Sequence, residues 1–261
     1  MRSRRYRIVV AAVVAAMAVM VGAGAAQAVF PNFSGCTLRN PDFGGNAEDG
    51  ACVNVQQRSG NLRIKNFNVP LHETLEIRGI LVPNGTTTPT FRAPTGSTGF
   101  IGKPERVPGG LLGIEWLPGN SVLAITELAG SPSDIRLSLT DFSIRIPIKM
   151  RLVNLLLGMD CHIGTNSRPV MLNLITETTS PPAPNTPISG RVGTISELPG
   201  GGLQAIGNVN VENSFAVPGA TECGFGLGLI NSLVNLRLGL PSAAGNNSGE
   251  IRSDVAIGYV P

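Results

Sequence analysis

Two short strings place the chain's only histidines beside residues that could do chemistry. Asp160-Cys161-His162 brings together an acid, a thiol and an imidazole, the groups that a cysteine nucleophile and its base need. His72 and Glu76 have the spacing of the two histidines in the zinc-binding helical motif His-Glu-x-x-His. Glutamate stands here in place of the second histidine, and the surrounding alternation of apolar residues indicates a strand. We expect a disulfide-bonded thiol with a half-buried histidine beside it, and neither a catalytic residue nor a metal ligand at either string.

An acidic loop between the first two cysteines offers oxygen atoms that a cation could bind. It contains Asp42, Glu48 and Asp49 among glycine and asparagine residues. Ca²⁺ prefers such oxygens, but the spacing matches no calcium-loop pattern, so we interpret the segment as a solvated turn. The sequence has no nucleophile elbow, phosphate-binding loop or dinucleotide fingerprint, and we expect no cofactor.

The first 28 residues have the pattern of a secretory signal peptide. Four arginines lie within residues 2–7, residues 8–21 are apolar and uncharged, and the Ala-Gln-Ala string at residues 26–28 is a small-residue cleavage site. The apolar run is too short for a membrane span. We predict a mature protein that begins near Val29 and is secreted or associated with the cell wall, with no transmembrane anchor.

Removal of this signal also removes the excess of basic charge. The full sequence has 20 Lys and Arg against 17 Asp and Glu, and residues 1–28 hold four of the basic residues and no acid. The remaining 16 basic and 17 acidic residues nearly cancel in charge. This balance argues against nucleic acid or an anionic membrane as the partner. Residues 29–261 are enough for a single exported domain with its own core.

The four cysteines predict two disulfides, because their number is even in a chain that we expect to be exported. Three pairings are possible. Proximity in the sequence and similar surroundings favour Cys36–Cys52 and Cys161–Cys223. The second bridge would join the middle of the chain to its last third, so that both regions belong to one folded unit.

Alternating apolar residues indicate β-strands along most of the mature chain. The clearest case is residues 142–153, where six apolar residues at period two face a core and the other face carries two arginines and one lysine. Pro147 cannot donate to a strand ladder, so we expect this strand at a sheet edge or with a bulge. Weaker alternation predicts strands at residues 62–67, 75–82, 121–128, 135–139, 170–176, 209–215 and 251–259.

Turns rich in glycine and proline separate these segments, and the chain has 33 Gly and 20 Pro to supply them. Many short strands at this spacing predict an all-β, mostly antiparallel sandwich or barrel-like domain. One short helix is expected at residues 227–238, with Gly239 at its C-terminal cap. The proline-rich segment 176–187 is expected to be a surface loop, with a domain linker as the alternative.

One seven-residue string occurs twice in nearly the same form. Residues 152–158 read LVNLLLG and residues 233–239 read LVNLRLG, each near a cysteine. The simpler interpretation is two similar packing elements with asparagine and glycine in turn or cap positions. A duplicated half-domain is the alternative. The repeat also suggests that residues 152–157 leave the preceding strand and turn helical.

Five strings between residues 140 and 250 resemble sequence strings of a protein family. They are RLVNLLLG at 151–158, CHIG at 161–164, NSFAVPGA at 213–220, CG at 223–224 and LGLPSAAGNN at 238–247. Together they resemble a functionally uncharacterised family of secreted actinobacterial proteins. The resemblance implies export and a shared fold but no activity. The family pattern has proline where Leu155 stands and tyrosine where His162 stands, and a histidine that tyrosine can replace is not expected to be a catalyst.

The leading functional hypothesis is a non-enzymatic protein. We expect an exported binding or structural protein whose partner is a component of the cell wall or envelope, and not nucleic acid. One alternative is a carrier that holds an apolar ligand or lipid inside the β domain. Another is a hydrolase that cleaves cell-wall polymer with a pair of carboxylates. The sequence predicts neither the specific ligand nor the oligomeric state.

Overall fold

The computed structural model describes residues 33–38, 50–85, 88–114, 117–198, 201–225 and 228–260. They belong to one compact unit, Asn32–Pro261. The predicted signal peptide and the acidic loop with Asp42, Glu48 and Asp49 lie outside these residues. The elements are β1 (Ala51–Ile64), β2 (Phe67–Leu71), β3 (Leu75–Val82), β4 (Thr90–Arg92), β5 (Phe100–Gly102), β6 (Glu105–Arg106), β7 (Leu123–Leu128), β8 (Ser133–Leu137), β9 (Phe142–Val153), β10 (His162–Ile163), β11 (Val170–Ile175), β12 (Thr194–Glu197), β13 (Gly202–Glu212), β14 (Ala220–Thr221), α2 (Gly228–Leu238) and β15 (Asn247–Gly258).

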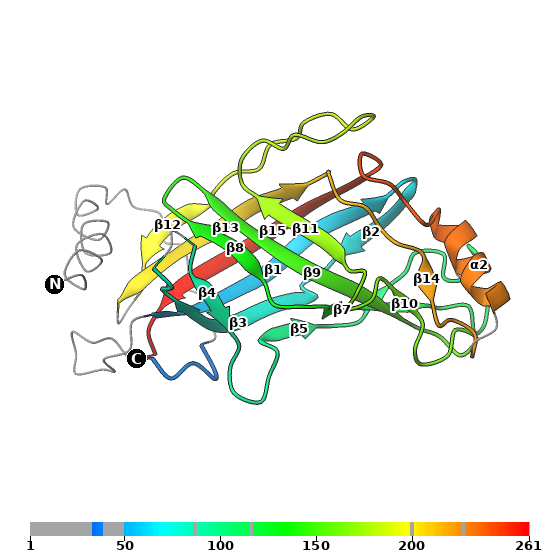
Figure 1. The fold of residues 1–261 in the computed structure, drawn as a ribbon, viewed down its shortest axis with the longest axis horizontal. Coiled ribbons are helices and arrows are strands. Elements are labelled where there is room, and N and C mark those ends of the chain that lie inside the picture. Colours follow the sequence, from blue (N-terminus) through cyan, green and yellow to red (C-terminus); the bar gives the residue numbers. More distant parts are fainter. Residues whose placement is uncertain are drawn as a thin grey trace. The chain divides into compact units, whose positions relative to one another are not determined.

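All of these strands belong to one antiparallel sheet, which curls into a half-barrel (Figure 1). Its main path runs β14-β10-β9-β11-β13-β15-β1-β3-β4, and the shorter strands pair along the sides of β1, β3, β7, β9 and β13. The prediction of an all-β, mostly antiparallel fold with one short helix is therefore confirmed. A single curled sheet replaces the two separate layers of a sandwich.

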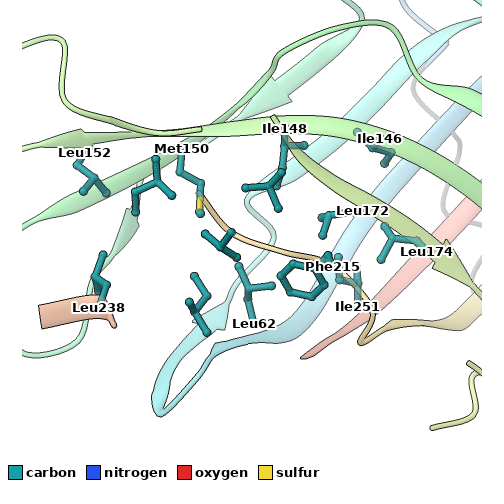
Figure 2. Packing of buried hydrophobic residues seen from close by; sticks show 14 of the residues in the cluster. Leu62, Ile146, Ile148, Met150, Leu152, Leu172, Leu174, Phe215, Leu238 and Ile251 are labelled. Atoms are coloured by element: carbon teal, nitrogen blue, oxygen red, sulfur yellow. The ribbon is translucent and has the colours of Figure 1, made fainter. Parts of the chain in front are cut away.

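The core lies on the inner side of the curl. Side chains of β9 and β11 pack toward those of β1 and β15, and Phe215, from the connection between β13 and β14, lies among them (Figure 2). Burial of such branched and aromatic side chains stabilises the fold by roughly 1.5–3 kcal/mol for each residue. The alternating strands supply this core because every second side chain of a strand points to the same face.

Strand β9 lies inside the sheet, so of the two expected alternatives the edge position is wrong, and the register shift near Pro147 lies in β8 rather than in β9. Strand β9 pairs with β10 and β11 on one side and with β7 and β8 on the other. Pro147 fits there because β7 ends at Leu128 and β8 starts at Ser133, which leaves a gap in the ladder opposite the proline. The carbonyl oxygen of Pro147 accepts a hydrogen bond from the Ala129 nitrogen at 2.9 Å. The position thus needs an acceptor and no donor.

Of the remaining strand predictions, residues 75–82 are confirmed with the same ends and the others with shifted ends, apart from residues 62–67. That segment is the end of β1, a turn and the start of β2. Residues 176–187 are the expected surface loop between β11 and β12, which pair with neighbouring parts of the same sheet. The loop is pinned by a hydrogen bond from the Thr179 nitrogen to the Ile188 oxygen at 2.9 Å.

Helix α2 confirms the predicted helix and its cap. Gly239 follows it with a φ of +69°, and the Leu240 nitrogen donates to the Asn235 oxygen at 2.8 Å. Both are features of a glycine-terminated helix, since the left-handed residue lets the last carbonyls find partners. Val234 and Leu238 are the buried residues of the helix. No helix in the described part of the chain is long and apolar enough to cross a bilayer.

Strands β5 and β7 approach each other closely on the outside of the curl. A Cβ atom added to Gly102 of β5 would overlap with the carbonyl oxygen of Thr126 in β7. No ladder is formed between these strands among the described pairings. The absence of a side chain at Gly102 thus allows a close backbone approach that helps to enclose the core.

Candidate functional site

Both predicted disulfides are formed, with the favoured pairing. Cys36 is bonded to Cys52 and Cys161 to Cys223, and the described part of the chain has no free cysteine. Cys161 is fully buried and bridged, so its sulfur is not available as a nucleophile. Disulfides of this kind are typical of proteins that fold outside the reducing cytoplasm.

His162 lies beside the second disulfide in a small charged cluster. Its Nδ1 is 2.7 Å from the backbone oxygen of Asp160, and its Nε2 is 3.8 Å from Glu127. Glu127 also binds Arg151 at 2.7 Å and lies 3.7 Å from Lys149. Burial raises the pKa of Glu127, but these cations outweigh burial and hold it below its usual value. The cluster is a charge network on strands β7, β9 and β10.

His72 and Glu76 do not meet. His72 is exposed and pairs with Glu105, with 3.3 Å between Nδ1 and the nearest carboxylate oxygen. Glu76 binds Arg78 at 2.6 Å, and hydrogen bonds from Arg78 and Asn54 outweigh its burial and lower its pKa. Within the described residues, no three His, Cys, Asp or Glu side chains are grouped as metal ligands.

The most unusual feature is a concentration of exposed apolar side chains at one end of the sheet. Ten large apolar residues are exposed in the described part of the chain, and eight of them lie on three segments: the β9–β10 turn, residues 222–225 together with α2, and residues 107–114. Hydrogen bonds from Gly224 to Leu157 and from Arg237 to Pro108 link these segments. Five are between 70% and 85% exposed. We call this surface the apolar end, and its residues are Leu112, Ile114, Leu155, Leu156, Met159, Phe225, Leu229 and Leu236.

The first segment is the turn between β9 and β10. Chain reversal begins at Asn154, whose side chain accepts a hydrogen bond from the Leu156 nitrogen at 2.8 Å, and Gly158 has a φ of +78°. Leu157 points into the core and is fully buried. Leu155 and Leu156 therefore face solvent, with exposed fractions of 85% and 58%. The segment is a turn, so the suggested helix at residues 152–157 is wrong.

The second segment holds Phe225 in solvent. Glu222, Gly224 and Phe225 all have a left-handed backbone, with φ of +60°, +70° and +57°. This conformation costs a residue with a side chain roughly 1–2 kcal/mol relative to the right-handed region. A Cβ atom on Gly224 would overlap with Ile230, so glycine is required there. The result is a phenylalanine that is 78% exposed in a strained turn.

The third segment, residues 107–114, is shaped by Asn120. The Asn120 side chain accepts a hydrogen bond from the Leu112 nitrogen at 2.7 Å and donates to the oxygens of Gly109 and Ile114. Arg237 of α2 lies against the same loop and donates to the Pro108 oxygen at 3.4 Å. Leu112 and Ile114 are thereby presented beside the helix.

A shallow apolar groove of about 400 Å³ lies between the β9–β10 turn, Phe225, and Gly119 and Ser121. None of the described residues that line the groove is charged. Apolar contact is what this lining can provide. The lining residues are Gly119, Ser121, Val153, Asn154, Leu155, Gly158, Met159 and Phe225.

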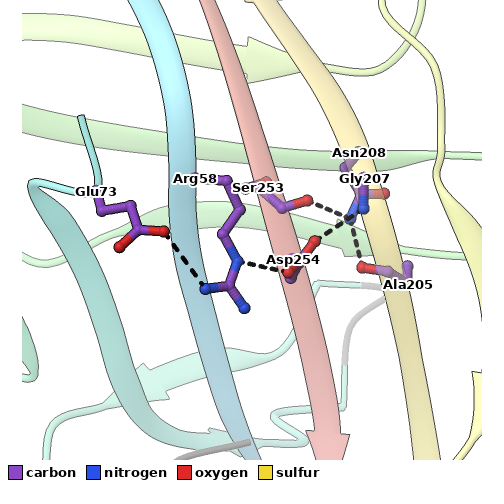
Figure 3. A network of polar contacts seen from close by, with 7 residues as sticks. All are labelled: Arg58, Glu73, Ala205, Gly207, Asn208, Ser253 and Asp254. Atoms are coloured by element: carbon purple, nitrogen blue, oxygen red, sulfur yellow. Dashed lines mark hydrogen bonds and ion pairs between the residues drawn. The ribbon is translucent and has the colours of Figure 1, made fainter. Parts of the chain in front are cut away.

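A polar network lies on the long strands β1, β13 and β15 (Figure 3). Asp254 of β15 binds Arg58 of β1 at 2.6 Å and accepts a hydrogen bond from the Gly207 nitrogen of β13 at 2.8 Å. The pairing register shifts at Gln57/Ser59 in β1 and at Ala205/Asn208 in β13. Asp254 therefore stabilises irregularities in both neighbouring strands.

Polar side chains also lie on the inner face of the sheet at this level. Ser253 pairs with Gln57 on one side and with Asn208 on the other, and its hydroxyl donates to Asn210 at 3.1 Å. Asn210 is opposite Ile251, a core residue, which places both on the inner face. Gln57 Nε2 and Asn210 Nδ2 are buried donors without a hydrogen-bond acceptor among the described residues.

Glu212 is the buried carboxylate of the described residues, at 4% exposure. Burial raises its pKa above the usual value, although the backbone nitrogens of Ser214 and Asn173 donate to its oxygens. It is absent from the lining of the groove. Its contacts are those of a structural acid that fixes two backbone segments.

Comparison of the chain with protein-family models, curated proteins and solved structures finds no match. The resemblance to a secreted family therefore stays a prediction. The functional interpretation rests on the geometry of the chain itself.

Sequence reasoning did not find the apolar end, although a signal was present. Three consecutive leucines at residues 155–157 stand between Asn154 and Gly158, two residues that favour turns. Apolar residues within a turn have no strand or helix to direct all of them inward. The second copy of the string behaves similarly, because Leu236 is exposed and Leu238 is buried.

Proposed function

We propose that this chain is an exported binding protein that acts at the cell envelope through its apolar end, without a catalytic step. The observation that carries the proposal is the gathering of eight exposed apolar side chains on three adjacent segments. Contiguous apolar patches are uncommon on monomeric proteins and mark interaction surfaces. The two disulfides support a location outside the cytoplasm.

The energetics support a role in binding. Burial of each such side chain in a partner would contribute roughly 1.5–3 kcal/mol. The left-handed backbone at Phe225 lowers the stability of the fold by roughly 1–2 kcal/mol. Packing of the ring does not offset this loss, since the residue is 78% exposed. Features that cost stability without a local gain are characteristic of functional sites.

Fractionation of the native host tests this proposal. Leu155→Asp combined with Phe225→Asp should release the protein from the envelope fraction into the medium, because two charges would have to be buried on binding. Leu139→Asp is the matched control, since Leu139 is 41% exposed and precedes the opposite end of β9. Wild type and control should stay with the envelope. Equal release of all three proteins would contradict the proposal.

The carrier hypothesis is a second candidate, supported by the inner polar groups. Gln57 Nε2 and Asn210 Nδ2 are buried donors that could bind the carbonyl or carboxylate oxygen of an apolar ligand. Native mass spectrometry of the purified protein tests this idea. A co-purified lipid that is lost in Asn210→Leu would support it, and a spectrum of the bare chain would contradict it.

The hydrolase hypothesis gains no support from the groove. A carboxylate pair would have to flank a bound glycan, with at least one acid shielded from water. No acid is among the described residues that line the groove, and Glu212 is held by backbone nitrogens elsewhere.

A further inference from the structure

We infer that the partner of the apolar end is the hydrocarbon of a lipid layer, into which the exposed loop side chains insert. This inference rests on the proposed function and names the partner of the same surface. It concerns peripheral insertion of loop tips from outside the layer. Three properties of the apolar end support it: the absence of charge, the internal pairing of its backbone, and the way its side chains protrude.

The segments that form the apolar end carry no charge. Residues 107–114, 117–126, 152–159 and 223–236 contain no Asp, Glu, Lys or Arg, and Glu115 is the one acid between the first two of these ranges. A charged group would have to leave water on insertion, at a high cost, whereas these segments have none to desolvate. The lack of charge also gives the surface no electrostatic preference for an acidic or basic partner.

The charges that flank these segments in the sequence show no basic excess. Three are arginines and four are acids, so the flanks carry a net charge of −1. An excess of basic residues would indicate attraction to anionic headgroups. Its absence predicts binding that does not require anionic lipid and that depends little on salt. The seven flanking residues are Arg106, Arg151, Arg237, Glu115, Glu127, Asp160 and Glu222.

The backbone of the protruding loops is hydrogen-bonded from within. Asn154 donates to the oxygens of Gly119 and Ser121, both at 2.8 Å, and accepts from the Leu156 nitrogen. Asn120 plays the same part in its own loop, where it contacts the backbone of Leu112. Backbone groups that enter hydrocarbon need internal partners, because lipid chains offer none.

Two asparagines of α2 extend this pattern. Asn231 accepts a hydrogen bond from the Cys223 nitrogen at 2.8 Å, and Asn235 accepts from the Ala220 nitrogen at 2.7 Å. The segment that leads to Phe225 is thereby also satisfied internally. Four asparagine side chains are thus used for the protein's own loops.

The same facts favour lipid over a protein partner or a second copy of this chain. Protein interfaces form about one hydrogen bond per 100–200 Å² and match the partner's shape. Here four asparagine side chains are engaged with the protein's own loops, and Leu155, Phe225 and Leu229 protrude individually with exposed fractions of 78–85%. Hydrocarbon chains surround such side chains without a complementary shape.

Flotation with phosphatidylcholine vesicles tests the inference on the full mature chain. Wild type should float with the vesicles, and the fraction bound should change little between low and high salt. Leu155→Asp and Phe225→Asp should each lower the partition coefficient roughly tenfold to a hundredfold, because an apolar anchor is replaced by a charge. Leu139→Asp should float like wild type, and equal melting temperatures would show that the variants are folded.

The outcomes separate the inference from the proposed function. No flotation of wild type, together with envelope retention that depends on Leu155 and Phe225, would overturn the lipid partner and leave the binding role intact. Envelope retention that is indifferent to these substitutions would overturn the proposed function as well. Flotation that needs anionic lipid and disappears in salt would overturn neutral insertion. A wild-type dimer that Phe225→Asp dissociates would assign the surface to a second copy.

Discussion

The backbone nitrogen of Gly224 donates a hydrogen bond to the carbonyl oxygen of Leu157 at 2.8 Å. This bond joins the turn that carries Leu155 to the segment that carries Phe225, directly after the disulfide-bonded Cys223. Two protruding parts of the apolar end are therefore fixed relative to each other before any partner arrives. Such preorganisation reduces the entropy that is lost on binding.

Replacement of Phe225 by glycine should stabilise the protein and weaken its binding. Glycine adopts the left-handed backbone without a steric cost, so Phe225→Gly should raise the free energy of unfolding by about 0.5–1 kcal/mol. Little packing is lost, since Phe225 is 78% exposed. Urea unfolding measures the stability, and envelope fractionation measures the binding. A destabilised variant that keeps full binding would show that the ring serves the fold.

The two disulfides should differ in their effect on stability. Cys161 and Cys223 are 62 residues apart, whereas Cys36 and Cys52 are 16 apart. The chain-entropy model therefore assigns about 4 kcal/mol to Cys161–Cys223 and about 3 kcal/mol to Cys36–Cys52. Urea unfolding of the paired Cys→Ser variants measures both. The loss of Cys161–Cys223 should also weaken binding, because this bridge lies beside the Gly224–Leu157 contact. A larger loss from the shorter loop would contradict the prediction.

Replacement of Asp254 should lower the stability of the protein far more than replacement of Glu250 in the same strand. Asp254→Ala removes a charged pair with Arg58 and a hydrogen bond from the Gly207 nitrogen, and should cost about 2–3 kcal/mol. Glu250→Ala removes only an exposed contact with Arg252, and should cost less than about 0.5 kcal/mol. Thermal unfolding compares the two variants. Equal losses would show that the paired bulges do not depend on Asp254.

The contributions of Glu127 and Glu212 to folding stability should change in opposite directions with pH. The pKa of Glu127 is lowered on folding, so its contribution is present above its usual value of 4.5 and is lost as pH falls through the folded pKa. The pKa of Glu212 is raised, so folding loses stability as pH rises from 4.5 through the folded pKa.

Urea unfolding of Glu127→Gln and Glu212→Gln over a pH series measures these contributions. The stability of wild type relative to Glu127→Gln should increase as pH rises, by less than about 1 kcal/mol because the pair is partly exposed. The stability of wild type relative to Glu212→Gln should decrease over the same change. Parallel curves for the two variants would contradict the assignment.

Much of the fold could be predicted because local pattern and pairing agree in the long strands. Residues 142–153 alternate clearly and residues 75–82 more weakly, and the structure has strands with these same bounds. Strands β10 and β14 have two residues each and depend on tertiary pairing, so no local pattern could reveal them. Pro147 was misjudged because the gap opposite it arises where β7 ends and β8 begins, and the alternation of β9 alone does not reveal this break.

The apolar end could not be predicted for a different reason. A leucine or phenylalanine in a sequence is expected in the core, since burial is the usual fate of such residues. Leu155 and Leu157 are two residues apart in one string, yet one is 85% exposed and the other is fully buried. The difference is set by a turn at Asn154 and by contacts with Cys223 and Gly224 far along the chain. Cysteine pairing, in contrast, followed correctly from sequence proximity.

Substitution of Gly102 should open the contact between β5 and β7. Gly102→Ala places a Cβ atom against the carbonyl oxygen of Thr126, a backbone atom that cannot move without its strand. We expect a loss of more than about 2 kcal/mol, as for other overpacked sites. Gly228→Ala is the control, because the space around Gly228 is open and alanine favours the helix. Thermal unfolding should separate the variants. A Gly102→Ala protein as stable as Gly228→Ala would show that this approach of two strands does not constrain the sheet.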